Sequence, residues 1–295
     1  MNALVIGAGG LGQPAAEALA RAGVGVRLVD GDAVERSNLP RQLLFTESEV
    51  GSRKVNSAAE ALRRRVPGAR VEPVDALFSA ATAEALFAGM AVALDCTDRL
   101  ATRFLANDRA LAAGVPLVHG AVLGWGGQAM AISRGRAGCY RCLFEAPPPE
   151  GSVPTCAQAG VIGPACGVVG ALMARLALRL LAGDDAACGV LTTVDLLSGR
   201  VRRVPVPRDE RCPACAIPPG TPRVDLSADR CPLTWVKTKL ALEPLGPGAL
   251  LAVELGDAEA VRDVPRSASE DGHRPLALVP RGAGAFTLLL QKSLV

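Results

Sequence analysis

Apolar and polar positions follow one another along the first half of the chain in a pattern that predicts strands and helices in turn. Short segments of strand length, most of them rich in apolar residues, occur at 3–7, 24–29, 71–74, 92–95 and 117–120. Between them, apolar residues recur at helical spacing in 13–22, 57–66, 80–87 and 103–113. This regular alternation is typical of an α/β fold with a parallel, doubly wound sheet of the Rossmann type.

The pattern changes after residue 128, where strand-like and irregular pieces precede a predicted helix at 166–181 and strands at 190–196 and 201–206. The Pro- and Gly-rich stretch 217–223 predicts a linker. Beyond it we expect a strand, a helix that ends at Leu242, a strand at 250–255, a polar segment and two final strands. The chain is therefore predicted to hold a large domain at 1–216 and a small α+β domain at 224–295.

The composition excludes several classes of protein. Apolar residues make up 49% of the chain and charged residues 21%, which is typical of a globular protein and not of a disordered one. The net charge is +3 and there is no basic block, so we expect no nucleic-acid partner. The longest apolar run, 168–181, contains Arg175 and Arg179 and is too short to span a membrane.

The N-terminal strand lacks the basic region of a signal peptide, so we expect a cytoplasmic protein without a membrane partner. Thiols stay reduced in that compartment. The nine cysteines therefore indicate metal binding or thiol chemistry before they indicate disulfides.

A glycine-rich turn lies between the first predicted strand and helix. Gly7, Gly9 and Gly12 fit the pattern G-x-G-x-x-G, which lets the backbone and a helix N-terminus approach a pyrophosphate. Asp30, at the end of the second strand, is placed to accept hydrogen bonds from ribose hydroxyls. This motif alone favours NAD, and an NAD-dependent oxidoreductase is the first alternative.

Three downstream segments change that interpretation: SNLPRQ at 37–42, GSRK at 51–54 and LDCTD at 94–98. Together with the glycine loop they make residues 1–216 resemble the ThiF/MoeB/HesA family, relatives of ubiquitin-activating enzymes. The resemblance implies an adenylating enzyme that uses ATP to activate a C-terminal carboxylate. The ATP-site residues that it implies are Gly9, Asp30, Ser37, Asn38, Arg41, Lys54 and Asp98.

The chemistry of adenylation accounts for this set. A carboxylate attacks the α-phosphate of ATP, and the charge that builds on the phosphate oxygens needs cations such as Arg41 and Lys54. A Mg²⁺ ion on the phosphates needs a carboxylate, and Asp98 ends a strand where it suits that role. A dehydrogenase has no use for these three residues. Asp32 also lies in this region, but a loop cap explains it equally well.

The sequence departs from its relatives at two points. Relatives often carry an N-terminal helix whose arginine reaches the partner's ATP site in a dimer, and this sequence starts at the first strand. Pro40 also replaces a polar or larger residue. A carrier-binding scaffold that has lost adenylation is therefore a further alternative.

Two C-x-x-C pairs predict a metal site. Cys139 with Cys142, and Cys212 with Cys215, supply four thiolates, which suit a closed and structural tetrahedral Zn²⁺ site. The metal would join the last segment of the large domain to its middle. A redox role of either pair is the alternative.

Cys156 lies in a predicted loop ahead of the long helix. Relatives have a cysteine there that in some cases takes part in thioester or persulfide chemistry, and a non-essential loop cysteine is an equally open interpretation. Cys96, Cys166 and Cys188 are interpreted as structural.

Residues 222–293 resemble the TusA/SirA sulfurtransferase family, whose mark is Cys-Pro at the start of the first helix, with a second proline two residues later. Here the pair is Cys231-Pro232, and Thr234 replaces the second proline. Proline is favoured at the first position of a helix, which would make Cys231 the cap and favour its thiolate or persulfide.

The sequence thus predicts adenylation of a ubiquitin-like sulfur carrier of the ThiS/MoaD type, followed by sulfur transfer through Cys231. A cysteine desulfurase is the expected sulfur source, and the resemblance implies a homodimer. ATP, Mg²⁺ and Zn²⁺ are the expected cofactors.

Overall fold

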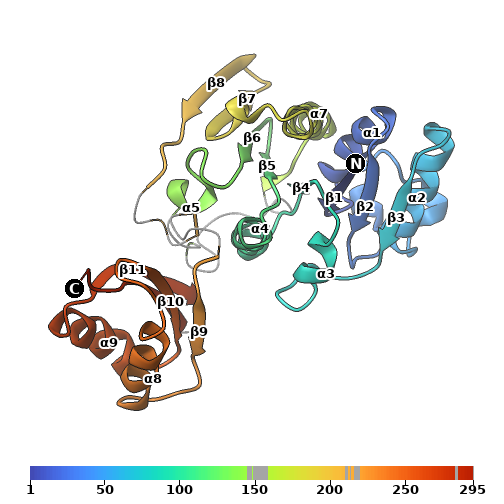
Figure 1. Cartoon of the computed structure of the whole chain (residues 1–295). Coiled ribbons are helices and arrows are strands. Elements are labelled where there is room, and N and C mark those ends of the chain that lie inside the picture. Colours follow the sequence, from blue (N-terminus) through green and yellow to red (C-terminus); the bar gives the residue numbers. More distant parts are fainter. Residues whose placement is uncertain are drawn as a thin grey trace. The chain divides into compact units, whose positions relative to one another are not determined.

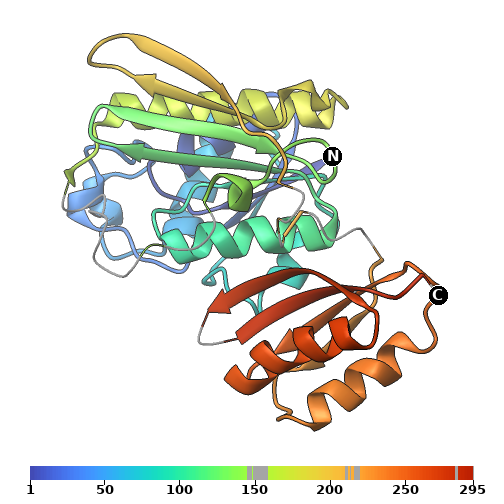
Figure 2. The ribbon, with the colours of Figure 1, turned by 90° about the vertical axis from the view of Figure 1, so that its left-hand side faces the viewer.

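The computed structural model describes residues 1–144, 148, 159–209, 212, 214–215, 220–282 and 285–294. The chain divides into two compact units, Met1–Arg208 and Asp209–Val295. Figures 1 and 2 show the ribbon of both from two directions.

The first unit is built on an eight-stranded sheet in the order β3-β2-β1-β4-β5-β6-β7-β8. The first five strands in this order pair in parallel, and β6 to β8 continue the sheet antiparallel. The strands are β1 (Asn2–Ile6), β2 (Gly25–Val29), β3 (Val71–Val74), β4 (Val92–Asp95), β5 (Leu117–Leu123), β6 (Gly126–Ile132), β7 (Val190–Asp195) and β8 (Arg200–Pro205). Pro73 is tolerated in β3 because this strand lies at the sheet edge and pairs with β2 alone.

Helices cover both faces of this sheet. On one face lie α1 (Gly12–Arg21), α2 (Lys54–Arg65) and α7 (Gly163–Leu181). On the other lie α3 (Ala83–Phe87), α4 (Leu100–Ala113) and the short α5 (Tyr140–Leu143), so that α7 and α4 run along opposite faces in Figure 2. Three single turns complete the unit: η1 (Arg36–Asn38), η2 (Glu47–Glu49) and η3 (Asp185–Ala187).

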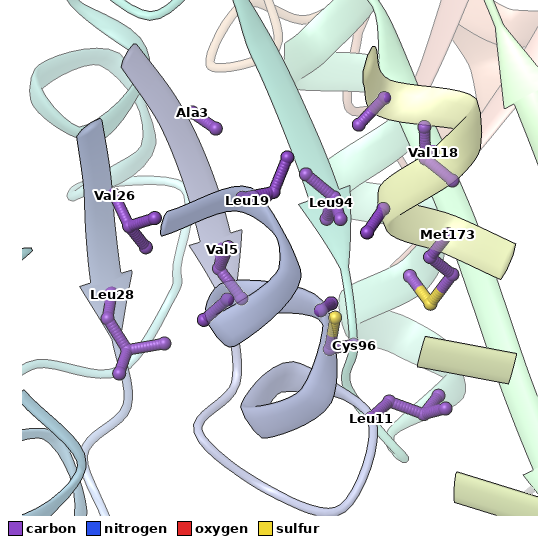
Figure 3. Packing of buried hydrophobic residues seen from close by; sticks show 14 of the residues in the cluster. Ala3, Val5, Leu11, Leu19, Val26, Leu28, Leu94, Cys96, Val118 and Met173 are labelled. Carbon is purple, nitrogen blue, oxygen red and sulfur yellow. The ribbon is translucent and has the colours of Figure 1, made fainter. Parts of the chain in front are cut away.

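The main core fills the space between the sheet and α1, α2 and α7. In Figure 3, Val5 and Leu94 project from β1 and β4 toward Leu19 of α1, and Met173 of α7 lies on the β5 side. Because strands in a parallel sheet are buried on both faces, β1 and β4 are apolar without alternation. This packing fixes the C-terminal ends of β1 and β4 side by side.

Helix α7 has a length and a mean hydropathy, 1.5 over its 18-residue window, that would also suit a membrane span. One such helix is weak evidence, because core helices meet the same criterion. Half of that window is buried, and α7 packs against α1, β5 and β6.

The second unit is a four-stranded sheet in the order β11-β12-β10-β9 with two helices packed on it. Its elements are β9 (Arg223–Leu226), α8 (Leu233–Leu242), β10 (Leu250–Leu255), α9 (Ala258–Glu270), β11 (Arg274–Gly282) and β12 (Ala285–Gln291). Strand β9 pairs with β10 in parallel, and the other pairs are antiparallel. The predicted fold class, a Rossmann-like sheet followed by a small α+β unit, is confirmed.

The sequence analysis predicted no helix in the polar segment after β10, whereas residues 258–270 form helix α9. The helix buries only Ala260, Val264 and Ala268, one residue per turn, and Asp257 caps it by accepting a hydrogen bond from the Ala260 amide. Pro265 lies inside it and weakens the helical pattern of the sequence. The helical spacing of these three residues was thus present in the sequence, and Pro265 argued against a helix there.

Candidate active site

The glycine loop joins β1 to α1 and is tightly packed. Gly7 has φ +100°, a conformation that residues with a Cβ rarely adopt. A Cβ on Gly12 would lie 1.8 Å from the Gly7 carbonyl oxygen, so only glycine fits there. A Cβ on Gly9 would have the side-chain amide nitrogen of Gln42 as its nearest neighbour, at 3.7 Å. The space above the Gly9 backbone is therefore free.

The Asp30 carboxylate holds the loop against the end of β2. Its two oxygens accept hydrogen bonds from the Ala8 amide at 2.8 Å and from the Asp32 amide at 2.9 Å. Burial raises the pKa of Asp30, an effect opposed by these amides and by the charge of Lys54.

Gln13 of α1 ties the glycine loop to residues 37–45. Its side chain is buried, donates to the Ala8 carbonyl at 3.1 Å and accepts from the Leu44 amide at 2.8 Å. Gln42 is also buried, and its amide oxygen has no hydrogen-bond partner within the described part of the chain. Neither glutamine was selected in the sequence, where the buried polar position 13 on an apolar helix was the available signal.

Two cations stand beside the loop. The Arg41 guanidinium donates to the Ser37 carbonyl at 2.8 Å. Lys54, the first residue of α2, is only 8% exposed, and its ammonium lies 2.9 Å from an Asp32 carboxylate oxygen. A buried cation is stable only with such a partner, so Asp32 is more than a loop cap.

The turn after β4 presents Asp98. Asp95 is completely buried, and one of its oxygens accepts from the Thr97 amide at 3.1 Å and from the Thr97 hydroxyl at 2.7 Å. The other lies 3.1 Å from Nδ1 of buried His119, which therefore carries the proton. Burial lowers the pKa of His119, and the imidazole is neutral at neutral pH. The Asp98 side chain itself is exposed and makes no hydrogen bond or ion pair within the described residues.

These segments surround one cavity of about 470 Å³. It is lined by eight of the predicted residues: Gly7, Gly9, Asp30, Ser37, Asn38, Arg41, Lys54 and Asp98. Gly12 does not line it and acts through the shape of the loop. Lining residues that the sequence analysis did not select include Arg99, Arg103, Leu77, Phe78 and Cys166. The cavity is thus lined by acidic and basic side chains together with apolar ones such as Leu77 and Phe78.

The four cysteines of the two C-x-x-C pairs come together. The sulfur atoms of Cys139, Cys142, Cys212 and Cys215 all lie within 4.8 Å of one another, and those of Cys139 and Cys142 are 3.9 Å apart. Tetrahedral Zn²⁺ with Zn–S bonds of about 2.3 Å places sulfurs roughly 3.8 Å apart, so the cluster fits zinc. The Asn107 amide lies 3.8 Å from the Cys139 sulfur and orients it.

Of the two cysteines predicted to react, Cys156 lies outside the described residues. Cys231 is half-buried, and the predicted cap position was wrong by one residue, because α8 begins at Leu233 with Pro232 as its cap. The Thr234 hydroxyl donates a hydrogen bond to the Cys231 sulfur at 3.4 Å. Cys96, Cys166 and Cys188 are buried.

Comparison with known proteins identifies the larger unit. Residues 1–214 match the model of the ThiF family. The chain belongs to the ThiF family. Residues 223–292 match the model described as Sulfurtransferase TusA, so the second unit is a TusA domain.

Several relatives of this ThiF-family chain are named adenylyltransferases or activating enzymes. The SAMP-activating enzyme E1 of Haloferax volcanii is 42% identical over 72% of this chain and 79% of its own length. The sulfur carrier protein adenylyltransferase of Thermus thermophilus is 41% identical over 74% of this chain and 83% of its own. Adenylyltransferase and sulfurtransferase MOCS3 of Sus scrofa is 43% identical over 73% of this chain, but the match covers only 47% of that longer protein.

A solved structure shares the fold of the ThiF-family unit. The crystal structure of E. coli MccB with ATP has a TM-score of 0.65 and 19% identity, covering 73% of this chain and 67% of that one. At this identity the likeness establishes the fold alone.

Proposed function

We propose that this chain adenylates the C-terminal glycine carboxylate of a ubiquitin-like sulfur carrier of the ThiS/MoaD type and that its TusA domain supplies sulfur. The observation that supports the proposal most strongly is that Arg41, Lys54 and Asp98 line one cavity with the glycine loop. The relatives named as adenylyltransferases point to the same reaction.

The cavity suits the first half-reaction. The carrier carboxylate attacks the α-phosphate of ATP, an acyl-adenylate forms and pyrophosphate leaves. Arg41 and Lys54 oppose the charge on the phosphate oxygens, and open Gly9 lets them approach the backbone. Asp30 is the acceptor for ribose hydroxyls, and the buried Gln42 amide oxygen is available to a donor on the nucleotide.

Two metal ions fit residues of this chain. Asp98, exposed and unpaired within the described residues, would hold Mg²⁺, which supplies charge neutralisation to the bound phosphates. The Cys139, Cys142, Cys212 and Cys215 cluster would hold a structural Zn²⁺, because four thiolates leave no open ligand position.

The second half-reaction transfers sulfur. An acceptor thiolate, for which Cys156 is our candidate, attacks the terminal sulfur of a Cys231 persulfide, and Cys231 leaves as a thiolate. The acceptor persulfide attacks the acyl carbon, AMP leaves and an acyl disulfide forms. A second thiol cleaves this disulfide, which releases the carrier thiocarboxylate and leaves the acceptor in a disulfide with that thiol. Joining donor and acceptor in one chain raises their effective concentration.

We also propose that the protein acts in the cytoplasm as a homodimer and receives its sulfur from a cysteine desulfurase. Strand β8 supports the dimer, since it is a sheet-edge strand with every residue exposed, including Val201 and Val204. Light scattering of the purified chain tests the dimer, and transfer of ³⁵S from a desulfurase to Cys231 tests the source.

The decisive experiment is ATP–pyrophosphate exchange with a purified ThiS/MoaD-type carrier. We expect carrier-dependent exchange in the wild type and a loss of about 100-fold or more in Asp98→Ala. Glu60→Gln, which removes an exposed carboxylate away from the cavity, serves as the matched control and should exchange normally. Carrier binding without exchange in the wild-type protein would instead support the scaffold alternative.

A further inference from the structure

The residue that replaces the second proline of the TusA pattern contacts the sulfur of Cys231. Thr234 lies in the first turn of α8 and is completely buried, and its hydroxyl donates to the Cys231 sulfur at 3.4 Å. Within the described residues this is the only hydrogen bond that the Thr234 hydroxyl makes. The neighbouring buried Thr238 differs, since its hydroxyl donates to the Thr234 carbonyl at 2.7 Å.

Burial limits the hydrogen-bond partners that the Thr234 hydroxyl can reach. A buried hydroxyl cannot turn to water, so the sulfur of Cys231 is its partner in the fold. A hydrogen bond to an ionised acceptor is stronger than one to a neutral acceptor. The contact therefore favours the form of Cys231 in which the sulfur carries negative charge.

The charged groups near Cys231 lie on three segments. Arg262 of α9 interacts electrostatically with Cys231 and is paired with Asp263 at 2.9 Å. Arg230 is the exposed residue that precedes Cys231 in the chain, and Asp229 before it is paired with Lys237 of α8 at 2.5 Å. Thr234 thus supplies a neutral, buried donor to a sulfur whose cationic neighbour Arg262 is itself paired with a carboxylate.

We propose that Thr234 is a positioning residue for sulfur transfer, whose hydroxyl stabilises the Cys231 sulfur when it carries negative charge. This inference rests on the proposed role of Cys231. The Cys231 sulfur carries this negative charge at two steps of sulfur transfer. In loading, the Cys231 thiolate attacks the terminal sulfur of a donor persulfide, the S–S bond of the donor breaks and the donor thiolate leaves. In delivery, an acceptor thiolate attacks the terminal sulfur on Cys231, and Cys231 leaves as a thiolate with the electron pair.

The test is the pH profile of Cys231 alkylation by iodoacetamide in the full-length, zinc-loaded chain, followed by peptide mass spectrometry. Thr234→Val keeps the shape of the side chain and removes the hydroxyl. We expect the midpoint of its profile to rise by about one pH unit, which is roughly tenfold less thiolate below the midpoint. Thr234→Ser retains the hydroxyl and should restore the wild-type midpoint.

Two further variants keep the test decisive. Thr238→Val is the matched control, because it removes a buried hydroxyl of the same helix that does not contact Cys231, and its midpoint should equal that of the wild type. Thr234→Pro restores the family residue, which the first turn of a helix tolerates, and should show the raised midpoint even if Thr234→Val does not fold. A wild-type midpoint in folded Thr234→Val or Thr234→Pro would overturn the proposal.

Failure of this inference is distinguishable from failure of the proposed function. Alkylation needs neither ATP nor a carrier, so it reports on the contact alone. Undiminished thiocarboxylate formation by Cys231→Ser would remove the sulfur-carrying role, and the positioning role with it, while leaving the adenylation result unaffected.

Discussion

The Lys54 ammonium lies 2.9 Å from a carboxylate oxygen of Asp32, and the Lys54 backbone amide donates to the Asp32 carbonyl at 3.0 Å. Two contacts between the same residues, 22 positions apart, thus fix the first residue of α2 against the loop after β2. Asp32 is more than half exposed, whereas Lys54 is buried. The carboxylate therefore holds a buried cation at the wall of the cavity.

This arrangement predicts unequal effects of the two residues on adenylation. Lys54→Met removes the cation and should lower carrier-dependent pyrophosphate exchange by about 100-fold or more. Asp32→Asn keeps Lys54, its backbone contact and a side-chain oxygen that can accept from the ammonium, so we expect a loss of about tenfold or less, measured in the same assay. Asp75→Asn, which breaks an exposed pair with Arg53 outside the cavity lining, is the control and should change exchange little. Normal exchange by Lys54→Met would rule out its proposed role.

We expect alanine at two positions of the glycine loop to have different effects, one on ATP binding and one on stability. Gly9→Ala meets no atom closer than 3.7 Å, so it should fold with an unchanged melting temperature but weaken ATP binding, because its methyl group enters the cavity. Gly12→Ala places a Cβ 1.8 Å from the Gly7 carbonyl and should destabilise the protein itself. Thermal melts with and without ATP separate the two. A Gly9→Ala protein whose melting temperature rises with ATP as much as that of the wild type would contradict the proposed position of the phosphates.

The sequence was sufficient to predict those strands and site residues that a short stretch of neighbouring residues determines. Strands 71–74 and 92–95 agree with the structure to the residue. The second is a mainly apolar segment, and in the first Val71 and Val74 enclose Glu72 and Pro73 at the sheet edge. The ATP-site residues follow from motifs at the ends of such strands, where a doubly wound sheet brings them together. Their assignment to ATP chemistry stays a prediction that the exchange assay tests.

What the sequence could not predict depends on contacts between distant segments. The pairing of Lys54 with Asp32 and the Thr234 contact with Cys231 carry no local pattern. A polar residue at position 13 of an apolar helix was visible in the sequence, but its two hydrogen-bond partners were not. The hydrogen-bond roles of Thr234 and Gln42 are visible only once burial has removed the competing water. Helix α9 was missed because tertiary packing of three small or β-branched residues outweighs its interior proline.

The cysteine cluster predicts one tightly bound zinc ion per chain, measured by elemental analysis. Cys142→Ser should lose the metal and lower the melting temperature by on the order of 10 °C, because a structural zinc site contributes directly to folding. Cys231→Ser removes a cysteine outside the cluster and should keep both the zinc and the melting temperature. Stoichiometric zinc in Cys142→Ser would show that the two pairs do not form one site.

We expect the buried thiol of Cys188 to lower the free energy of unfolding at alkaline pH. Burial raises the pKa of this thiol to about 11, from an ordinary value of 9.0. Below pH 9 the thiol is protonated in the folded and unfolded chain alike, so it contributes no pH dependence. Between about pH 9 and 11 the unfolded chain has released a proton that the folded chain still holds, so the free energy of unfolding falls as the pH rises.

Cys188→Ala removes this titration, although it also loses some packing at every pH. Urea denaturation at pH 8 and pH 10.5 should therefore show a larger fall in the free energy of unfolding for the wild type than for Cys188→Ala, by on the order of 1 kcal/mol. The comparison of the two pH values within each protein cancels the packing loss, and all other titrating groups are common to both. Equal falls would mean that the Cys188 thiol ionises in the folded chain as readily as in the unfolded one.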